Sequence, residues 1–158
     1  MTVEFIDATM EHCKIIAENM RECDKNEVWA SSHQEPLTAL VESLKLSTYA
    51  QTATLDGVPC AMYGVGAKNV LDDWGAPWML ATDDLRLWGK QFLMRSIRVI
   101  REMLQFHPIL FNFVDARNAA SIQWLIWLGF DVSPQPEPWG MDGLPFHTFR
   151  KTRRDYRA

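Results

Sequence analysis

A long amphipathic segment between two apolar runs is the feature that most restricts the fold of this chain. Along residues 89–106, apolar side chains recur at the spacing of one helix face, and charged side chains occupy the opposite face. The flanking runs, residues 76–82 and 109–115, are short and mostly apolar, as buried strands are. A helix that connects two such strands forms a βαβ unit, in which the strands lie parallel in one sheet. We therefore predict an α/β centre built on a parallel strand pair.

Helices are expected before this unit, and strands on both sides of it. The N-terminal part is predicted to contain a strand at 2–6, a helix at 8–24, a helical region at 26–47 broken near 31–36, and strands at 49–55 and 58–67. Asp56-Gly57 between the last two strands is a strong signal for a tight hairpin turn. The C-terminal part is predicted to contain a helix at 118–128, an irregular stretch at 133–138, a strand ending within 139–150, and a basic tail at 151–158.

Composition favours one globular domain over residues 1–158. Hydrophobic residues make up 47% of the chain and charged residues 23%, which is sufficient for a core. The net charge of −4 opposes a broad nucleic-acid interface. No run reaches the ~18 apolar residues that span a membrane, and no signal peptide is visible. Three cysteines without a CxxC pair suggest neither a metal site nor a disulfide framework. Together, these observations lead us to expect a cytoplasmic protein without membrane or nucleic-acid partners.

Residues 115–130, DARNAASIQWLIWLGF, carry a resemblance to a known superfamily. An Asn that opens the last helix and a Gly-Phe that closes it are typical of the GNAT acyl-CoA N-acyltransferases, and Asn118, Gly129 and Phe130 stand at that spacing. The motifs D-x-R-N, W-L-x-W-L-G-F and G-x-P-F-x-x-F resemble a narrower group, the GNAT-like proteins of short-tailed bacteriophages. The resemblance implies a mixed, mostly antiparallel sheet with a central parallel βαβ unit, whose fourth and fifth strands splay apart.

The resemblance also implies a site for acetyl-CoA or CoA. In the superfamily, pantetheine pairs with the fourth strand, which here points to Leu80, Ala81 and Thr82, and the pyrophosphate lies where the following helix begins. The superfamily marks that loop Q/R-x-x-G-x-G/A. Arg86 and Gly89 fit the first four places, and Lys90 adds positive charge. However, the closing position holds Gln91, Trp88 is bulky, and Asp83 and Asp84 oppose an anion. Asn118 is expected near the pantetheine arm. The alternative is a polar loop before an ordinary helix.

The residues for catalysis are less well marked. Many members of the superfamily place a Tyr in the last helix as a general acid, but the corresponding residue here is Leu125, which has no proton to give. The fourth strand holds no Glu that could act as a base. His147 in the last strand is the weak candidate for a base, followed by Asp72, Asp73 and Asp83. A lone histidine is more often structural, so the catalytic residues stay unassigned.

Two functions are therefore compared. The first is acetyl-CoA-dependent N-acetyl transfer to an unknown amine or protein acceptor, from a degenerate active site. The second is a catalytically weak or inactive GNAT-like scaffold that binds a host or phage protein, which would place it in the cytoplasm of a bacterial host. The seven Trp residues mildly favour binding, because Trp is a frequent interface anchor.

The final helix is expected to be structural first. Its inner face is predicted to bury Ile122, Leu125 and Ile126, together with one or both of Trp124 and Trp127. Gly129 should then turn the chain and deliver Phe130 into the core.

Overall fold

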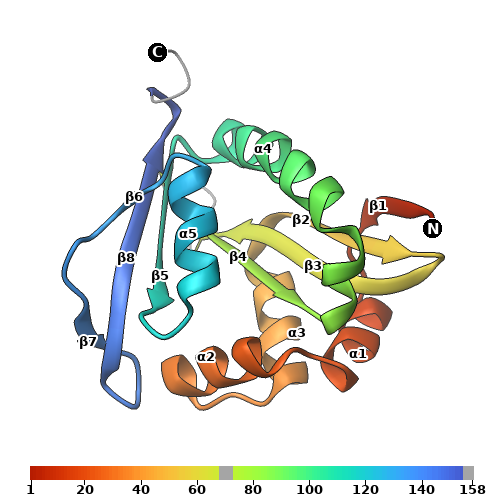
Figure 1. The fold of residues 1–158 in the computed structure, drawn as a ribbon, viewed down its shortest axis with the longest axis horizontal. Coiled ribbons are helices and arrows are strands. Elements are labelled where there is room, and N and C mark those ends of the chain that lie inside the picture. The colour runs from red at the N-terminus through yellow and green to blue at the C-terminus, as the bar shows by residue number, and fades with distance from the viewer. Residues whose placement is uncertain (68–72, 155–158) are drawn as a thin grey trace.

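The structure, a computed structural model, describes residues 1–67 and 73–154, and these form five α-helices, one 3₁₀-helix and eight strands (Figure 1). In chain order the elements are β1 (Val3–Asp7), α1 (Met10–Glu18), α2 (Glu22–Ser32), α3 (Pro36–Leu46), β2 (Ser47–Leu55), β3 (Val58–Gly66), β4 (Trp74–Ala81), the 3₁₀-helix η1 (Asp83–Trp88), α4 (Gly89–Phe106), β5 (Ile109–Asp115), α5 (Ala119–Trp127), β6 (Asp131–Val132), β7 (Glu137–Trp139) and β8 (Leu144–Thr152).

The predicted mixed sheet is confirmed. Its strand order is β1-β2-β3-β4-β5-β8-β6, with β7 paired to β8. Neighbours are antiparallel except β4 and β5, which are parallel and connected through α4 as the sequence predicts. These two strands pair only at Trp74 with Ile109 and at Gly75 with Leu110, and they separate beyond that point. The splay therefore opens toward the C-terminal ends of both strands (Figure 1).

Helices cover both faces of the sheet. On one face, α1 and α3 pack their apolar side chains against Met62 and Leu80. On the other face, α4 and α5 pack against Tyr63, Val65 and Leu110. Since side chains alternate between the faces of a strand, neighbouring residues of β3 and β4 contribute to different layers. The splay between β4 and β5 lies at the centre of this three-layer arrangement.

The predicted helix over residues 8–24 is wrong, because the chain breaks between α1 and α2. Met20 forms an isolated bridge with Thr82, and the Arg21 N–H donates to the Ala81 carbonyl at 2.9 Å. The backbone of Arg21 is extended, with φ −59° and ψ 146°. Residues 20–21 therefore lie antiparallel beside the end of β4, and the second helix begins at Glu22. It ends at Ser32, and the following His33 caps it with a left-handed φ of 54°, so the predicted break near 31–36 is confirmed.

The final helix matches its prediction in part. Leu125 is buried, Ile122 and Trp124 are partly buried, and Gly129, with φ 89°, turns the chain so that Phe130 enters the core. The expected burial of Ile126 is wrong, because its side chain is 57% exposed. Ile126 follows Leu125 directly and so lies about 100° further around the helix, away from the sheet.

The last strand extends further than the sequence suggested. β8 continues to Thr152 and buries Lys151, and the guanidinium of Arg153 donates to the carbonyls of Leu104 and Gln105. The start of the predicted tail is therefore attached to the fold, and residues 155–158 lie outside the described part of the chain. In that part, no helix has the length and apolar character needed to cross a membrane.

Candidate active site

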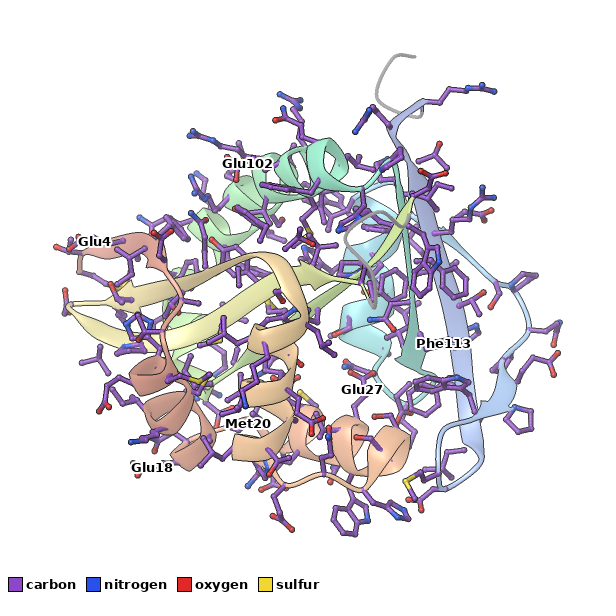
Figure 2. All side chains as sticks on the ribbon, turned by 180° about the vertical axis from the view of Figure 1, so that it is seen from behind. Glu4, Glu18, Met20, Glu27, Glu102 and Phe113 are labelled. Atoms are coloured by element: carbon purple, nitrogen blue, oxygen red, sulfur yellow. The ribbon has the colours of Figure 1, made fainter. Side chains whose placement is uncertain are left out.

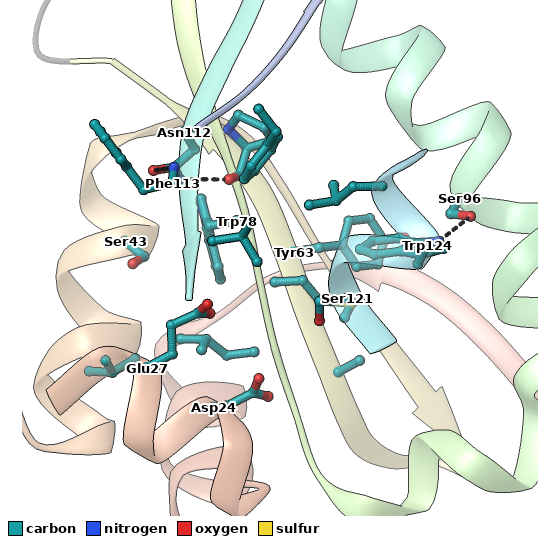
Figure 3. A pocket seen from close by; sticks show the side chains of 18 of the residues that line it. Asp24, Glu27, Ser43, Tyr63, Trp78, Ser96, Asn112, Phe113, Ser121 and Trp124 are labelled. Atoms are coloured by element: carbon teal, nitrogen blue, oxygen red, sulfur yellow. Dashed lines mark hydrogen bonds between the residues drawn. The ribbon is translucent and has the colours of Figure 1, made fainter. Parts of the chain in front are cut away.

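The splay between β4 and β5 opens into a cavity of about 260 Å³ that reaches both faces of the sheet (Figure 3). On one face its walls come from α2, α3, β7 and β8, and on the other face they come from α4 and α5. Most lining side chains are apolar or aromatic, and polar groups are few. A concave, mostly apolar cavity with a few polar groups is the usual form of a small-molecule site.

The main chain of β4 offers one open position at this splay. Alternate residues of a strand direct their N–H and C=O groups to opposite edges. The Thr82 N–H donates to the Cys60 carbonyl of β3, so Leu80 and Thr82 face β3. Met79 and Ala81 consequently face the splay. Among the described residues, no strand pairs with Met79 on that side, because the ladder between β4 and β5 ends at Gly75.

The other groups on this edge are already bonded. The Ala81 N–H donates to Oδ2 of Asp24 and its carbonyl accepts from the Arg21 N–H, both at 2.9 Å. The Pro77 carbonyl accepts from Nδ2 of Asn112, also at 2.9 Å. Of the residues at the end of β4, Met79 therefore has unpaired main-chain groups facing the splay, whereas the predicted Leu80 and Thr82 face β3 and Ala81 is bonded to Arg21 and Asp24. Sequence reasoning missed Met79 because the direction of its main chain depends on the register with β3.

Asp24 and Arg21 form a clamp between α2 and the end of β4. The Asp24 side chain is buried, and its two oxygens accept from Nε and Nη2 of Arg21 at 3.0 and 2.9 Å. One of these oxygens also accepts from Ala81. A buried carboxylate with a bidentate guanidinium partner is well satisfied and has a fixed position. The clamp therefore fixes the first turn of α2 against β4.

Glu27 lies one turn further along α2, on the side of the helix that faces the sheet (Figure 2). Its side chain points into the cavity, below Trp78 and toward the end of β5 (Figure 3). Oε1 accepts a hydrogen bond from the Asp115 N–H at 2.7 Å. Burial raises the pKa of Glu27 to about 7, and the nearby charges of Asp24 and Asp115 add to that rise. A carboxyl group with this pKa can exchange a proton near neutral pH.

Sequence reasoning missed Glu27. The resemblance implies a base on or near β4, whereas this carboxyl group comes from α2. Its surroundings are formed by residues far away in sequence, including Asp115 at a separation of 88 residues. The spacing of Asp24 and Glu27, three residues apart on one helix, was the only available signal, and it becomes informative only once the face of α2 is known.

The loop after β4 presents its polar side chains to solvent. Arg86 and Lys90 are exposed, and Nε of Arg86 donates to the Asp83 carbonyl at 3.2 Å. Gly89 is helical, and a Cβ built there would meet nothing within 4 Å. The Trp88 side chain is buried against Phe5 and Phe92, so it leaves the outer surface of the loop clear. No side chain caps the first turn of α4.

The remaining predicted residues lie away from the cavity. Oδ1 of Asn118 accepts from the Ser121 N–H at 3.3 Å, so Asn118 caps α5. His147 is hydrogen-bonded through Nδ1 to the Ser133 carbonyl at 2.7 Å and does not line the cavity. Since a carbonyl only accepts, Nδ1 of His147 carries the proton.

Neither Asp73 nor Asp83 lines the cavity. The Asp73 carbonyl accepts from the Ile109 N–H, and Asp83 is exposed. Asp72 lies outside the described residues. Among the residues that the structure describes, no group of three or more His, Cys, Asp or Glu side chains could hold a metal ion.

The α5 wall of the cavity contains Leu125 and Ser121. Leu125 is 6% exposed and packs in the core, so the position expected to hold a Tyr has no proton donor. Ser121 lies one turn earlier, and its hydroxyl makes no hydrogen bond with any described residue. By contrast, the Ser96 hydroxyl donates to the Leu93 carbonyl.

Comparison with known proteins identifies the fold. No protein-family model matches the sequence, and no curated protein matches it. Among solved structures, the spermidine N-acetyltransferase of Vibrio cholerae in complex with CoA and spermine matches with a TM-score of 0.71 at 9% identity, over 99% of this chain and 98% of that chain. The ribosomal-protein-S18-alanine N-acetyltransferase of Escherichia coli matches with a TM-score of 0.65 at 16% identity, over 96% and 94% of the chains.

A third structure carries the family name. An acetyltransferase of the GNAT family from Streptococcus pneumoniae matches with a TM-score of 0.62 at 14% identity, over 96% of this chain and 99% of that chain. At such low identities, the likeness shows the fold alone. The chain therefore has the GNAT-like fold that the resemblance implied.

Proposed function

We propose that the chain is an acetyl-CoA-dependent N-acetyltransferase in which Glu27 takes a proton from the acceptor amine. The observation that carries this proposal is the position of one carboxyl group. Glu27 reaches the cavity between the splayed strands, and its pKa is raised to about 7 by burial. General bases work best when their pKa lies near the working pH. The fold, which is shared with acetyltransferases of different acceptors, supports the reaction class.

The region between β4 and α4 fits acetyl-CoA. Met79 presents one N–H and one C=O to the splay, with which the amides of a pantetheine arm would pair like an added strand. The uncapped first turn of α4, flanked by the exposed side chains of Arg86 and Lys90, would hold the pyrophosphate. Gly89 has open space above its Cα, and Asn118 would lie beside the arm at the start of α5.

The chemistry follows from the residues around the splay. Acetyl-CoA supplies an acetyl group that is activated as a thioester. Glu27 accepts a proton from the acceptor ammonium, which leaves a neutral amine whose nitrogen lone pair attacks the acetyl carbonyl carbon. As the carbon–sulfur bond breaks, the Ser121 hydroxyl would donate a hydrogen bond to the departing sulfur, and the second proton that the attacking nitrogen still carries would pass to the thiolate. The products would be the N-acetylated amine and the free thiol of CoA. Because Leu125 stands in place of a tyrosine acid, the site is degenerate in this respect.

A binding protein on the same scaffold is the second candidate. It is favoured by Ile126 and Trp127, which expose 57% and 54% of their surfaces on the outer face of α5. Exposed Trp side chains are frequent anchors of protein interfaces. In this alternative the chain would bind a phage or bacterial host protein in the host cytoplasm, as the resemblance to phage proteins suggests, and turnover would be slow or absent.

Calorimetric titration with acetyl-CoA and with CoA separates the two candidates, followed by an assay of thiol release with a panel of amines. If the chain is an acetyltransferase, we expect acetyl-CoA and CoA both to bind, and we expect thiol release to require the amine. Glu27→Gln should keep acetyl-CoA binding and lose most of the turnover. No binding of either nucleotide, together with no thiol release, would reject the acetyltransferase and leave the binding protein.

A further inference from the structure

The α2 side of the cavity has an aromatic wall built from four strands. Trp78 of β4, Phe113 of β5, Trp139 of β7 and Phe146 of β8 all line it. The rings of Phe113 and Trp139 are stacked with centroids 4.1 Å apart, and Phe146 meets Trp139 edge-on at 5.0 Å. Nε1 of Trp78 donates to Oγ of Ser47 at 2.8 Å, which fixes its indole. Three of these rings contact one another and the fourth is held by Ser47, so together they form a preformed surface for a flat apolar group.

One carboxyl group on this side lacks a cationic partner. Asp24 is paired with Arg21 at 2.9 Å, and Asp115 is paired with Arg117 at 2.6 Å. Among the described residues, Glu27 makes no ion pair and accepts only from the Asp115 N–H. The cavity therefore offers one negative charge beside aromatic rings. That combination suits a single ammonium group, which is attracted both by a carboxylate and by the faces of aromatic rings.

The hairpin formed by β7 and β8 contributes Trp139 and Phe146 to this half of the cavity. At its tip, the N–H groups of Met141 and Asp142 donate to the carbonyls of Ser31 and Ala30, at 3.1 and 3.2 Å. The Asp142 carboxylate also bonds to Nε2 of His33 at 2.5 Å. The hairpin is thus attached to the C-terminal end of α2 by three bonds. A polypeptide acceptor would need these bonds to break before it could lie across the site.

We propose that the acceptor is a small primary amine with one aromatic or compact apolar group, whose ring lies against the aromatic wall and whose ammonium meets Glu27. The proposal rests on the proposed function and names the substrate class of that site. The whole cavity holds about 260 Å³, whereas a cavity of about 150 Å³ is enough for benzene. One ring with a short aminoalkyl arm fits this space. A polyamine would bring additional ammonium groups, for which the described residues on this side of the cavity offer no unpaired carboxylate.

Calorimetric binding of 2-phenylethylamine without CoA tests the site separately from acetyl transfer. We expect 2-phenylethylamine to bind about tenfold more tightly than neutral 2-phenylethanol, which is the effect of one charge-assisted contact. Spermidine and a hexapeptide with a free N-terminus should bind more weakly than 2-phenylethylamine. Glu27→Gln should remove the preference for the amine over the alcohol while 2-phenylethanol still binds, which shows that the variant is folded.

A matched pair of Trp variants tests the aromatic wall. Trp139→Leu should weaken 2-phenylethylamine binding about tenfold through loss of ring contact, whereas Trp127→Leu, on the exposed face of α5, should leave it unchanged. Tighter binding of spermidine or the peptide, no measurable binding of 2-phenylethylamine, or equal binding of the amine and the alcohol would overturn the proposal. If 2-phenylethylamine binds as expected and no amine is acetylated, the proposed function fails and the amine site stands. If other amines are acetylated and aromatic ones are not, only the acceptor class fails.

Discussion

Replacing Glu27 by Gln is expected to stabilise the protein at neutral and alkaline pH, because the fold buries this carboxyl group against its preference for ionisation. Burial is the first cause that raises its pKa from 4.5 to about 7, and the charges of Asp24 and Asp115 add to it. At 1.36 kcal/mol per unit, the shift corresponds to at most about 3 kcal/mol. Solvent screening of the partly exposed carboxylate reduces this to about 1–2 kcal/mol. Gln keeps an oxygen that can accept from the Asp115 N–H.

The pH dependence has a definite sign. Because the folded pKa of Glu27 lies above the unfolded value, the folded state binds this proton more tightly. The stability that protonated Glu27 contributes is complete below about pH 4.5 and is lost as the pH rises through about 7. Gln carries no charge and has no such loss. The free energy of unfolding of the variant should therefore exceed that of the wild type slightly at about pH 5, and by the full amount at about pH 8.

Urea denaturation followed by Trp fluorescence, at several pH values between about 5 and 8, measures this difference. Glu18→Gln is the matched control, since Glu18 is exposed at the end of α1 and points away from the cavity (Figure 2). The control should follow the wild type across the range. A Glu27→Gln variant that is equally stable at about pH 8, or less stable than the wild type there, would refute the buried-carboxylate argument and weaken the case for Glu27 as the base.

Three further predictions concern binding and turnover. The Arg86→Ala, Lys90→Ala double variant should bind CoA at least tenfold more weakly in calorimetry, because charge-assisted phosphate contacts contribute about 1.5–3 kcal/mol each, and unchanged affinity would place the phosphates elsewhere. In steady-state assays, log kcat/KM of the wild type should rise with pH and level off above about 7, where Glu27 loses its proton. Glu27→Gln should lower kcat/KM by about 10²–10⁴ and remove this pH dependence. Ser121→Ala should lower kcat by roughly tenfold with unchanged CoA affinity, whereas Leu125→Tyr, which places a phenol in the same wall, should raise it. The roles of these two residues would be rejected if Ser121→Ala had no effect and Leu125→Tyr brought no gain.

Local sequence patterns predicted those helices, strands and turns whose formation depends on residues close together in the sequence. The βαβ unit, the bounds of α4 and the hairpin turn at Asp56-Gly57 follow from periodicity and turn chemistry, and the structure has them. Gly129 was identified as a stop because a left-handed residue there favours glycine, and its φ is 89°. Such features require no knowledge of distant parts of the chain.

Features set by tertiary contact could not be predicted in this way. The helical pattern of residues 8–24 continues through Met20, and the chain breaks there because it pairs with the end of β4. Trp88 suggested an obstructed phosphate loop, yet its side chain turns inward to meet Phe5, which lies far away in sequence. The pKa of Glu27 likewise depends on burial against Asp115.

The pairing of residues 20–21 with the end of β4 connects the proposed cofactor position to the proposed base position. The Arg21 N–H bonds to the Ala81 carbonyl, and the Asp24 carboxylate bonds to the Ala81 N–H. Met79 is therefore the residue at this edge of β4 whose main-chain groups face the splay without a strand partner among the described residues. The same clamp fixes the first turn of α2, and one helical turn later the chain presents Glu27 to that edge. Cofactor position and base position are therefore set by one structural feature. A change in the clamp should disturb both together, whereas a change at Glu27 should leave the binding of acetyl-CoA unchanged.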